Sequence, residues 1–337
     1  MHSLHAFSRW GVAVVFLLVL ATTATISHAT EYPIEGYSDG QSFTQGDVMD
    51  FHVSSAIEHY HVTIQRIGAS RETVWEGDIE NGTRHRVPAD ASAQGCGWPV
   101  SFSVTVPAAW KSGYYEVFFG APAADNKEQW IDGRTTFFVI RAKNPGVKAK
   151  ILLQLTTNTY NAYDNWGGYS LYAYNSEEGR QGSKVSFSRP ITSGAWEWEV
   201  PFIQWAERNG YTLEYAVNSD LEFHPELLDH YQLVVSVGHD EYWSAPMRDN
   251  IERFVSAGGN LAFFGGNTLT WQVRFDNGGS EMVSWKKAYR QDPLYNPDGS
   301  NPLLSTLWSH PRVNRPENQL VGAGTMFGGM QRSKGQY

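Results

Sequence analysis

The feature that most constrains the fold is a change of pattern at Ala142–Gly146, where a proline and a glycine form a linker. After it, buried strands and helices are predicted to alternate, which is typical of a parallel α/β sheet. The predicted elements are strands at Lys150–Leu155, Thr212–Val217, Gln232–Val237 and Asn260–Phe264 and helices at Val200–Asn209, Pro225–His230 and Ala245–Ser256. We therefore expect an α/β domain over residues 148–337.

Helix Ala245–Ser256 has the clearest boundaries. Ser244 is the expected N-cap, Pro246 is tolerated in a first turn, and Gly258 follows the helix end. Beyond about Asn277 the sequence is rich in Gly, Asn, Pro and Ser and predicts long loops, with a terminal strand near residues 319–327.

Before the linker, short β-type runs alternate with turn residues. The predicted strands are Val48–Ser54, His61–Ile67, Val100–Val106, Tyr114–Phe119 and Thr135–Ile140. Period-two patterning at this spacing favours a small antiparallel, immunoglobulin-like β-sandwich over residues 30–142. We interpret it as an accessory module in front of the α/β domain.

The first 29 residues have the order of a secretory signal peptide. Arg9 precedes the apolar stretch Gly11–Ala21, and small residues lead to Ala29, where cleavage is expected. An uncleaved anchor is the alternative, but the apolar core is shorter than the roughly 20 residues of a membrane span. No later segment is long and apolar enough, so the mature chain is predicted to be secreted or periplasmic.

Charge and cysteine content exclude several classes of function. The net charge is -9, without a run of lysines or arginines, which argues against nucleic acid and anionic lipid as main partners. The single cysteine, Cys96, excludes an intramolecular disulfide, a thiolate zinc site and a Cys-X-X-Cys motif, and we expect it to be buried. The 14% aromatic content suits sugar-binding or small-ligand surfaces as well as cores.

Polar segments follow three of the predicted parallel strands, where ligands bind in such sheets. They are the tyrosine-rich stretch 156–172, the segment Gly238–Trp243, which contains a His-Asp-Glu run, and Gly265–Thr268. No serine or cysteine lies in the second segment, which argues against a Ser or Cys triad. Metal-assisted or general acid/base chemistry remains.

Residue types alone leave two interpretations of these segments open. Glu241 and tyrosine phenolates could hold iron or another cation that prefers oxygen ligands. Alternatively, the tyrosines pack as rim aromatics, the His-Asp-Glu run caps a helix, and Asn267 is a turn residue.

Four motifs carry a resemblance to a known family. In chain order they are TYNAYDNWGGYSLY (Thr159–Tyr172), VGHDEYWS (Val237–Ser244), RFVSAGGNLAFFGGNTLTW (Arg253–Trp271) and RPENQLVGAGTMF (Arg315–Phe327). Over roughly residues 150–330 the sequence resembles the catalytic carboxyl-terminal domain of the large (beta) subunit of N,N-dimethylformamidase. The resemblance implies a glutamine-amidotransferase-like (flavodoxin-like) parallel-sheet domain that lacks that fold's nucleophilic cysteine.

The resemblance also implies a mononuclear iron bound by two tyrosines and one glutamate. Carried over by motif, Glu241 is the carboxylate ligand and Tyr163 and Tyr172 are the phenolate ligands, with Tyr160 in reserve. Manganese or zinc could replace iron, depending on availability.

His239 and Asn267 match pocket residues and are the predicted catalytic pair. They would orient a water or a substrate carbonyl, and His239 would carry a proton to the departing amine. A hydrogen-bonded scaffold role for His239 is the alternative.

The implied function is an exported, metal-dependent hydrolase of a small-molecule amide or another non-peptide C–N bond. The alternatives are a non-catalytic cell-surface or glycan-binding protein with an inactive amidotransferase-like domain, and a structural module of an exported assembly. The family's enzyme works in the cytoplasm with a small partner subunit, whereas this chain has an export signal and a sandwich in front. Because the chain ends soon after Gly328-Gly329, we expect a truncated domain. The oligomeric state stays open, a homo-oligomer included.

Overall fold

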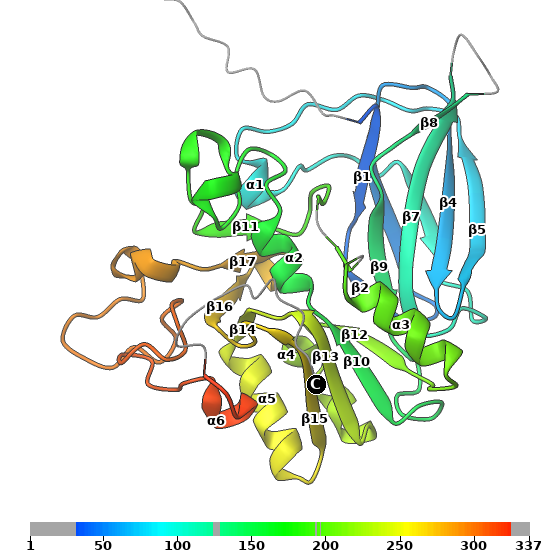
Figure 1. Ribbon diagram of the computed structural model, residues 1–337. Coiled ribbons are helices and arrows are strands. Elements are labelled where there is room, and N and C mark those ends of the chain that lie inside the picture. Colours follow the sequence, from blue (N-terminus) through cyan, green and yellow to red (C-terminus); the bar gives the residue numbers. More distant parts are fainter. Residues whose placement is uncertain (1–31, 124–128, 193, 196, 325–337) are drawn as a thin grey trace, which may run out of the picture.

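The computed structural model describes residues 32–123, 129–192, 194, 195 and 197–324. A β-sandwich and an α/β domain lie side by side (Figure 1). The predicted signal peptide, residues 1–29, lies outside the described residues. Among the described residues, no helix combines the length and the apolar character that crossing a bilayer requires.

The sandwich consists of two sheets. The first has the order β1-β3-β6 and the second the order β2-β9-β7-β4-β5, with β8 paired to β7. The strands are β1 Ile34–Ser38, β2 Ser42–Phe43, β3 Val48–Ser55, β4 Tyr60–Ile67, β5 Arg71–Ile79, β6 Phe102–Thr105, β7 Gly113–Pro122, β8 Trp130–Asp132 and β9 Thr136–Ile140. A short helix, α1 (Ala91–Gln94), lies between β5 and β6. All of these pairs are antiparallel except β2 with β9, which is parallel and departs from the predicted arrangement.

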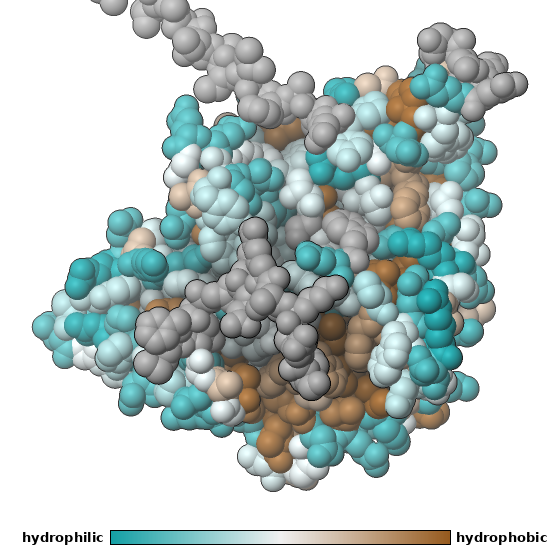
Figure 2. Space-filling model, in the orientation of Figure 1, coloured by the Kyte–Doolittle hydropathy of each residue, from teal (hydrophilic) through white to brown (hydrophobic). Residues whose placement is uncertain are grey.

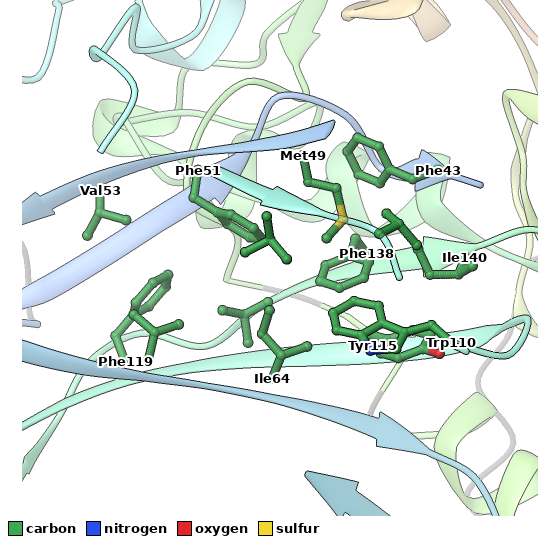
Figure 3. Packing of buried hydrophobic residues seen from close by; sticks show 14 of the residues in the cluster. Phe43, Met49, Phe51, Val53, Ile64, Trp110, Tyr115, Phe119, Phe138 and Ile140 are labelled. Carbon is green, nitrogen blue, oxygen red and sulfur yellow. The ribbon is translucent and has the colours of Figure 1, made fainter. Parts of the chain in front are cut away.

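Stacked aromatic rings fill the space between the two sheets (Figure 3). The rings of Tyr115 and Phe138 stack with centroids 5.2 Å apart, and Trp110 stacks on Tyr115 at the same distance. Phe51 of the facing sheet meets the Phe138 ring edge-on. Burial of such large apolar side chains is the main stabilising contribution to a core of this kind.

The α/β domain is built on a four-stranded sheet of order β12-β10-β13-β15, in which all neighbouring pairs are parallel. Its strands are β10 Ile151–Leu155, β12 Glu214–Val217, β13 Leu233–His239 and β15 Asn260–Gly266. The central strand β13 is a nearly continuous buried apolar run, as expected for a strand covered on both faces. The parallel sheet is therefore observed, while the glutamine-amidotransferase-like assignment stays a prediction.

Helices and a second sheet complete the α/β domain. The helices are α2 Thr157–Tyr163, α3 Glu199–Arg208, α4 Asp220–Phe223, α5 Ala245–Ser256 and α6 Asn318–Val321, with 3₁₀ turns at Ala173–Asn175, Glu177–Gly179, Pro225–His230, Asn277–Gly279 and Lys286–Gln291. The second sheet has the order β11-β17-β16-β14. Its strands are β11 Lys184–Ser186, β14 Tyr242–Ser244, β16 Trp271–Asp276 and β17 Glu281–Val283.

Helix α5 shows how the local sequence sets an element. Ser244 adopts an extended conformation and its hydroxyl accepts a hydrogen bond from the Met247 amide, so the predicted N-cap is confirmed. Met247, Ile251 and Phe254 recur at helical spacing and are all buried. The helix therefore begins and ends where the sequence predicts.

Two predicted elements differ from the structure. The segment Pro225–His230 is a 3₁₀ helix, not an α-helix. The predicted terminal strand near residues 319–327 is wrong in its described part, because Asn318–Val321 is helix α6 and Gly322 ends it in the left-handed conformation, with a φ of 77°. Residues 325–327 lie outside the described residues.

The sandwich is tied to the tyrosine-rich loop of the α/β domain. The indole of Trp166 donates a 2.9 Å hydrogen bond to Glu35 of β1. Ser92 of α1 donates to the Trp166 carbonyl and accepts from the Tyr169 amide. Two sandwich elements thus hold the loop that follows α2, which goes beyond the role of an accessory module. The single cysteine, Cys96, is buried as predicted.

A hydrophobic area lies on the surface around β15, at the bottom centre of Figure 2. Phe264 of β15 is exposed, and its ring lies 6.0 Å from that of Phe202 on α3. Within the described residues, β15 pairs with β13 alone and forms an edge of the parallel sheet. This edge is apolar along most of its length.

The N-cap can be tested by Ser244→Ala. We expect the free energy of unfolding to fall by about 1 kcal/mol, because the first turn of α5 loses its capping acceptor. Urea denaturation followed by tryptophan fluorescence measures the change. Ser256→Ala, an exposed change at the other end of the helix, is the control and should stay within about 0.5 kcal/mol of the wild type. Equal effects of the two changes would contradict the capping role.

Candidate metal and acid/base site

The candidate site lies where β10, β13 and β15 end. The tyrosine-rich loop and α2 follow β10, the His-Asp-Glu run closes β13 and continues into β14, and Asn267 directly follows β15. Since carboxyl ends of parallel strands meet at one edge of a sheet, three segments distant in sequence converge there.

Glu241 is the central residue of this edge. Its side chain is buried, and the Tyr163 and Tyr172 hydroxyls lie 3.2 Å and 2.6 Å from its Oε2 atom. The Asn267 amide nitrogen donates to Oε1 at 3.0 Å. The Thr159 hydroxyl accepts a hydrogen bond from the Glu241 backbone amide and fixes the backbone of this turn. Both carboxylate oxygens therefore have donors from other segments.

The two predicted phenolate ligands lie against each other. Their ring centroids are 4.3 Å apart, and both hydroxyls reach the same oxygen of Glu241. Tyr163 closes helix α2, whereas Tyr172 comes nine residues later, after the loop that Trp166 anchors to the sandwich. The structure thus brings together Tyr163, Tyr172 and Glu241.

The second predicted pair, His239 and Asn267, is also present at the site. The His239 Nε2 atom lies 3.1 Å from Glu241 Oε1 and 3.2 Å from the Asn267 amide nitrogen. When protonated, Nε2 donates to Glu241. When it is deprotonated, it can accept from Asn267. The imidazole can therefore gain or lose a proton without losing a hydrogen-bond partner.

The backbone at these positions is specialised. Asn267 has a φ of 54°, in the left-handed region that asparagine tolerates better than most residues. Gly238, directly before His239, has a φ of 89°. A Cβ atom there would lie 3.1 Å from the Trp198 ring and 3.3 Å from the Glu199 carboxyl carbon. Only glycine fits this turn without strain or displacement of a neighbour.

Two further residues at the site were not found by sequence reasoning. Lys286 is buried, and its ammonium donates to the Tyr242 hydroxyl at 2.8 Å and lies 3.1 Å from the centroid of the Tyr172 ring. The Tyr242 hydroxyl donates to that of Tyr172 at 2.7 Å. A chain of donors therefore runs from Lys286 through Tyr242 to Tyr172 and on to Glu241. Tyr242 could have been found from its place next to Glu241, but nothing in the sequence around Lys286 marks it.

The electrostatics of the site keep its carboxylate charged. Burial alone would raise the pKa of Glu241, but hydrogen bonds from His239 and Tyr172 and the charge of Lys286 outweigh it and lower the pKa. Burial and the nearby Glu241 charge raise the pKa of both Tyr163 and Tyr172. Burial lowers the pKa of Lys286 to about 7, against the opposing pull of Glu241. Without a further cation, the phenols stay protonated and the carboxylate holds the negative charge.

The reserve candidate and the middle residue of the His-Asp-Glu run point elsewhere. Tyr160 is buried and its hydroxyl donates to Glu199, not to Glu241. Asp240 is buried and accepts hydrogen bonds from Ser236 and Asn218, and burial raises its pKa to about 6. These two residues support the turn, whereas the side chains before and after Asp240 face the site.

The donors present fit an iron that prefers oxygen ligands. Both phenol oxygens, of Tyr163 and Tyr172, lie within hydrogen-bonding distance of one carboxylate oxygen of Glu241, so a cation could replace the shared protons. Across the described ranges, no group of three or more His, Cys, Asp or Glu side chains is arranged to hold a metal. A metal at this edge of the sheet would therefore depend on the two phenols.

Comparison with known proteins shows which family the chain belongs to. The model of the family described as N,N-dimethylformamidase beta subunit-like, C-terminal, matches residues 61–337, well over half of the chain. The chain belongs to this family. The resemblance predicted from the four motifs is thereby confirmed. The match to the dimethylformamidase-like family begins in β4, so it takes in most of the sandwich and extends further than the motifs indicated.

Two curated relatives carry the same family name. The N,N-dimethylformamidase beta subunit of Paracoccus aminophilus is 25% identical in an alignment of 224 residues, which covers 53% of this chain and 28% of that subunit. The N,N-dimethylformamidase beta subunit of an Alcaligenes species is 26% identical over 222 residues, again 53% and 28%. The matched part of this dimethylformamidase-like chain thus corresponds to just over a quarter of each relative.

The turn that carries His239 can be tested by Gly238→Ala. The matched control is Gly210→Ala, because Gly210 has a similar φ of 82° and open space around its Cβ position. We expect Gly210→Ala to cost about 1 kcal/mol of unfolding free energy from the left-handed backbone alone. Gly238→Ala should cost roughly 1 to 3 kcal/mol more, since it also displaces a neighbour. Equal losses in urea denaturation would show that Trp198 and Glu199 do not constrain the turn.

Proposed function

We propose that this chain is an exported, iron-dependent hydrolase that cleaves the C–N bond of a small amide. Membership of the N,N-dimethylformamidase beta subunit-like family supports the reaction class. One structural observation carries the proposal for this chain: both phenol oxygens of Tyr163 and Tyr172 meet the same carboxylate oxygen of Glu241.

Tyr163, Tyr172 and Glu241 are the residues that would hold the iron. When bound, a ferric ion supplies Lewis-acid polarisation of the amide carbonyl and lowers the pKa of water. The three side chains come from helix α2, from the short turn between β13 and β14 and from one anchored loop, so little rearrangement is needed to present them together.

His239 is the proton carrier in this proposal. Its side chain is one quarter exposed, so substrate can reach it, and its Nε2 atom has an acceptor in Glu241 and a donor in Asn267. It can therefore take a proton from an attacking water and deliver it to the departing amine nitrogen. Asn267 donates to the unprotonated ring and to Glu241. When Nε2 of His239 is protonated, one hydrogen of the Asn267 amide is free to donate to a substrate oxygen.

Lys286 supports negative charge on Tyr172. Its ammonium lies over the face of that ring, and Tyr242 passes a hydrogen bond from Lys286 to the Tyr172 oxygen. A cation and a donor at these positions lower the cost of a phenolate in a buried place. In this proposal Lys286 is a positioning residue and does not touch the substrate.

The proposal is tested by elemental analysis, visible absorption and an amide assay on purified mature protein. We expect about one iron per chain and a tyrosinate-to-iron charge-transfer band in the wild type. Tyr163→Phe, Tyr172→Phe and Glu241→Gln should each lose the band and most of the iron. Each Tyr→Phe change removes one oxygen ligand, and Glu241→Gln replaces the anionic carboxylate with a neutral amide. Release of dimethylamine from N,N-dimethylformamide, followed by NMR, should fall at least 100-fold in the same variants.

The matched control is Tyr211→Phe, which removes an exposed phenol stacked on Trp205 of α3, and it should leave iron and band unchanged. A folded, colourless and metal-free wild type would contradict the iron-dependent hydrolase. The non-catalytic glycan-binding protein would then be the better account.

Export is proposed from the sequence of residues 1–29. Full-length protein expressed in a Gram-negative host should be recovered from the periplasm with Thr30 as its first residue, because the signal ends in Ser27-His28-Ala29. Cell fractionation and mass spectrometry of the intact chain measure both features. Changing Ala29 to a bulky residue should block cleavage of the signal peptide. If the wild-type chain stays in the cytoplasm with residues 1–29 attached, the proposal of export is wrong.

A further inference from the structure

Two exposed aromatic side chains flank the candidate site without contributing a ligand. Trp198, which precedes α3, is 45% exposed, and Tyr174, in the 3₁₀ turn after Tyr172, is 74% exposed. An aromatic residue that only fills a core hides its ring, whereas these two present theirs to solvent. We call this pair the aromatic rim.

The aromatic rim touches the site from two directions. The Trp198 ring stacks on the His239 ring with centroids 6.1 Å apart and an interplanar angle of 27°. The Tyr174 ring lies 5.5 Å from the Tyr172 ring. His239 contacts Oε1 of Glu241, and Tyr172 contacts Oε2. Each rim residue therefore neighbours a side chain that contacts the Glu241 carboxylate.

Both rim residues lie against residues that contact Glu241. A substrate group held against the rim would therefore lie close to Glu241. A flat apolar group is the best match, because aromatic faces bind flat rings by offset stacking or edge-to-face contact.

We propose that the aromatic rim selects amides that carry a flat aromatic ring, over saturated or unsubstituted amides. This inference rests on the proposed function for the chemistry, but the binding preference can be measured without turnover. Trp198 and Tyr174 are its specificity-determining residues.

The test compares two ligands of nearly equal size. Formanilide carries a flat phenyl ring on nitrogen, and N-cyclohexylformamide carries a saturated ring in the same place. Ligand-observed NMR titration of the purified mature protein gives the two dissociation constants. We expect the wild type to bind formanilide about 3- to 10-fold more tightly, the size expected for aromatic contacts beyond area burial.

Variants identify the residue responsible. Trp198→Ala should abolish the preference for the flat ring, while Trp198→Phe, which keeps an aromatic face, should retain at least half of the affinity gain. Tyr174→Ala should reduce the preference. Trp205→Ala is the matched control, because Trp205 is also an exposed tryptophan, 54%, but it lies near the end of α3 and stacks on Tyr211. It should behave like the wild type.

Circular dichroism establishes whether each variant is folded. If Trp198→Ala is unfolded, Trp198→Phe still tests the role of the ring. The proposed selectivity is wrong if the wild type shows no preference for the flat ring, or if Trp198→Ala keeps the preference unchanged. Amide hydrolysis is scored separately on the same samples. A ring preference that depends on Trp198, in a protein that hydrolyses neither compound and also leaves N,N-dimethylformamide intact, would overturn the proposed function but not the ring preference.

Discussion

A carboxylate can be buried in a protein only if hydrogen-bond donors surround it, and the architecture of this α/β domain serves that requirement at Glu241. Donors reach its two oxygens from α2, from the tyrosine-rich loop and from the turn after β15. The first two segments follow β10, the third follows β15, and Glu241 itself follows β13. Because β13 lies between β10 and β15 in the sheet, donors from both neighbouring strands can reach Glu241.

The need for donors around Glu241 also explains why the sandwich matters to a site in the other domain. Tyr172 must return to Tyr163 across a loop of eight residues, and the loop is held by Trp166 and its partners Glu35 and Ser92 in the sandwich. The family match begins at residue 61 and so includes Ser92 but not Glu35. In the structure, the sandwich therefore helps to hold the loop that leads to Tyr172.

Much of this arrangement could be predicted from the sequence, and the gaps have physical causes. Periodic apolar runs and the Ser244 cap predict β13 and α5 well, because their signals are local. The motifs bring together Tyr163, Tyr172, Glu241, His239 and Asn267, while their roles as ligands and acid/base stay predictions. Lys286 could not be found, since its contact with Tyr172 depends on the path of the chain after β17. The sequence predicts a strand where helix α6 lies, because four residues are too few to distinguish the period of a helix from that of a strand.

The close packing at Gly238 has a consequence for how this site can be changed. Its α-carbon faces Trp198 and Glu199 with no room for a methyl group, and His239 follows directly. Substitutions at these four positions should therefore not act independently: a smaller side chain at 198 would relieve a larger one at 238. In directed evolution of new substrate ranges, most single substitutions at these positions would therefore be expected to lower activity or stability. Libraries that vary 198, 199 and 238 jointly would reach solutions that stepwise selection passes over.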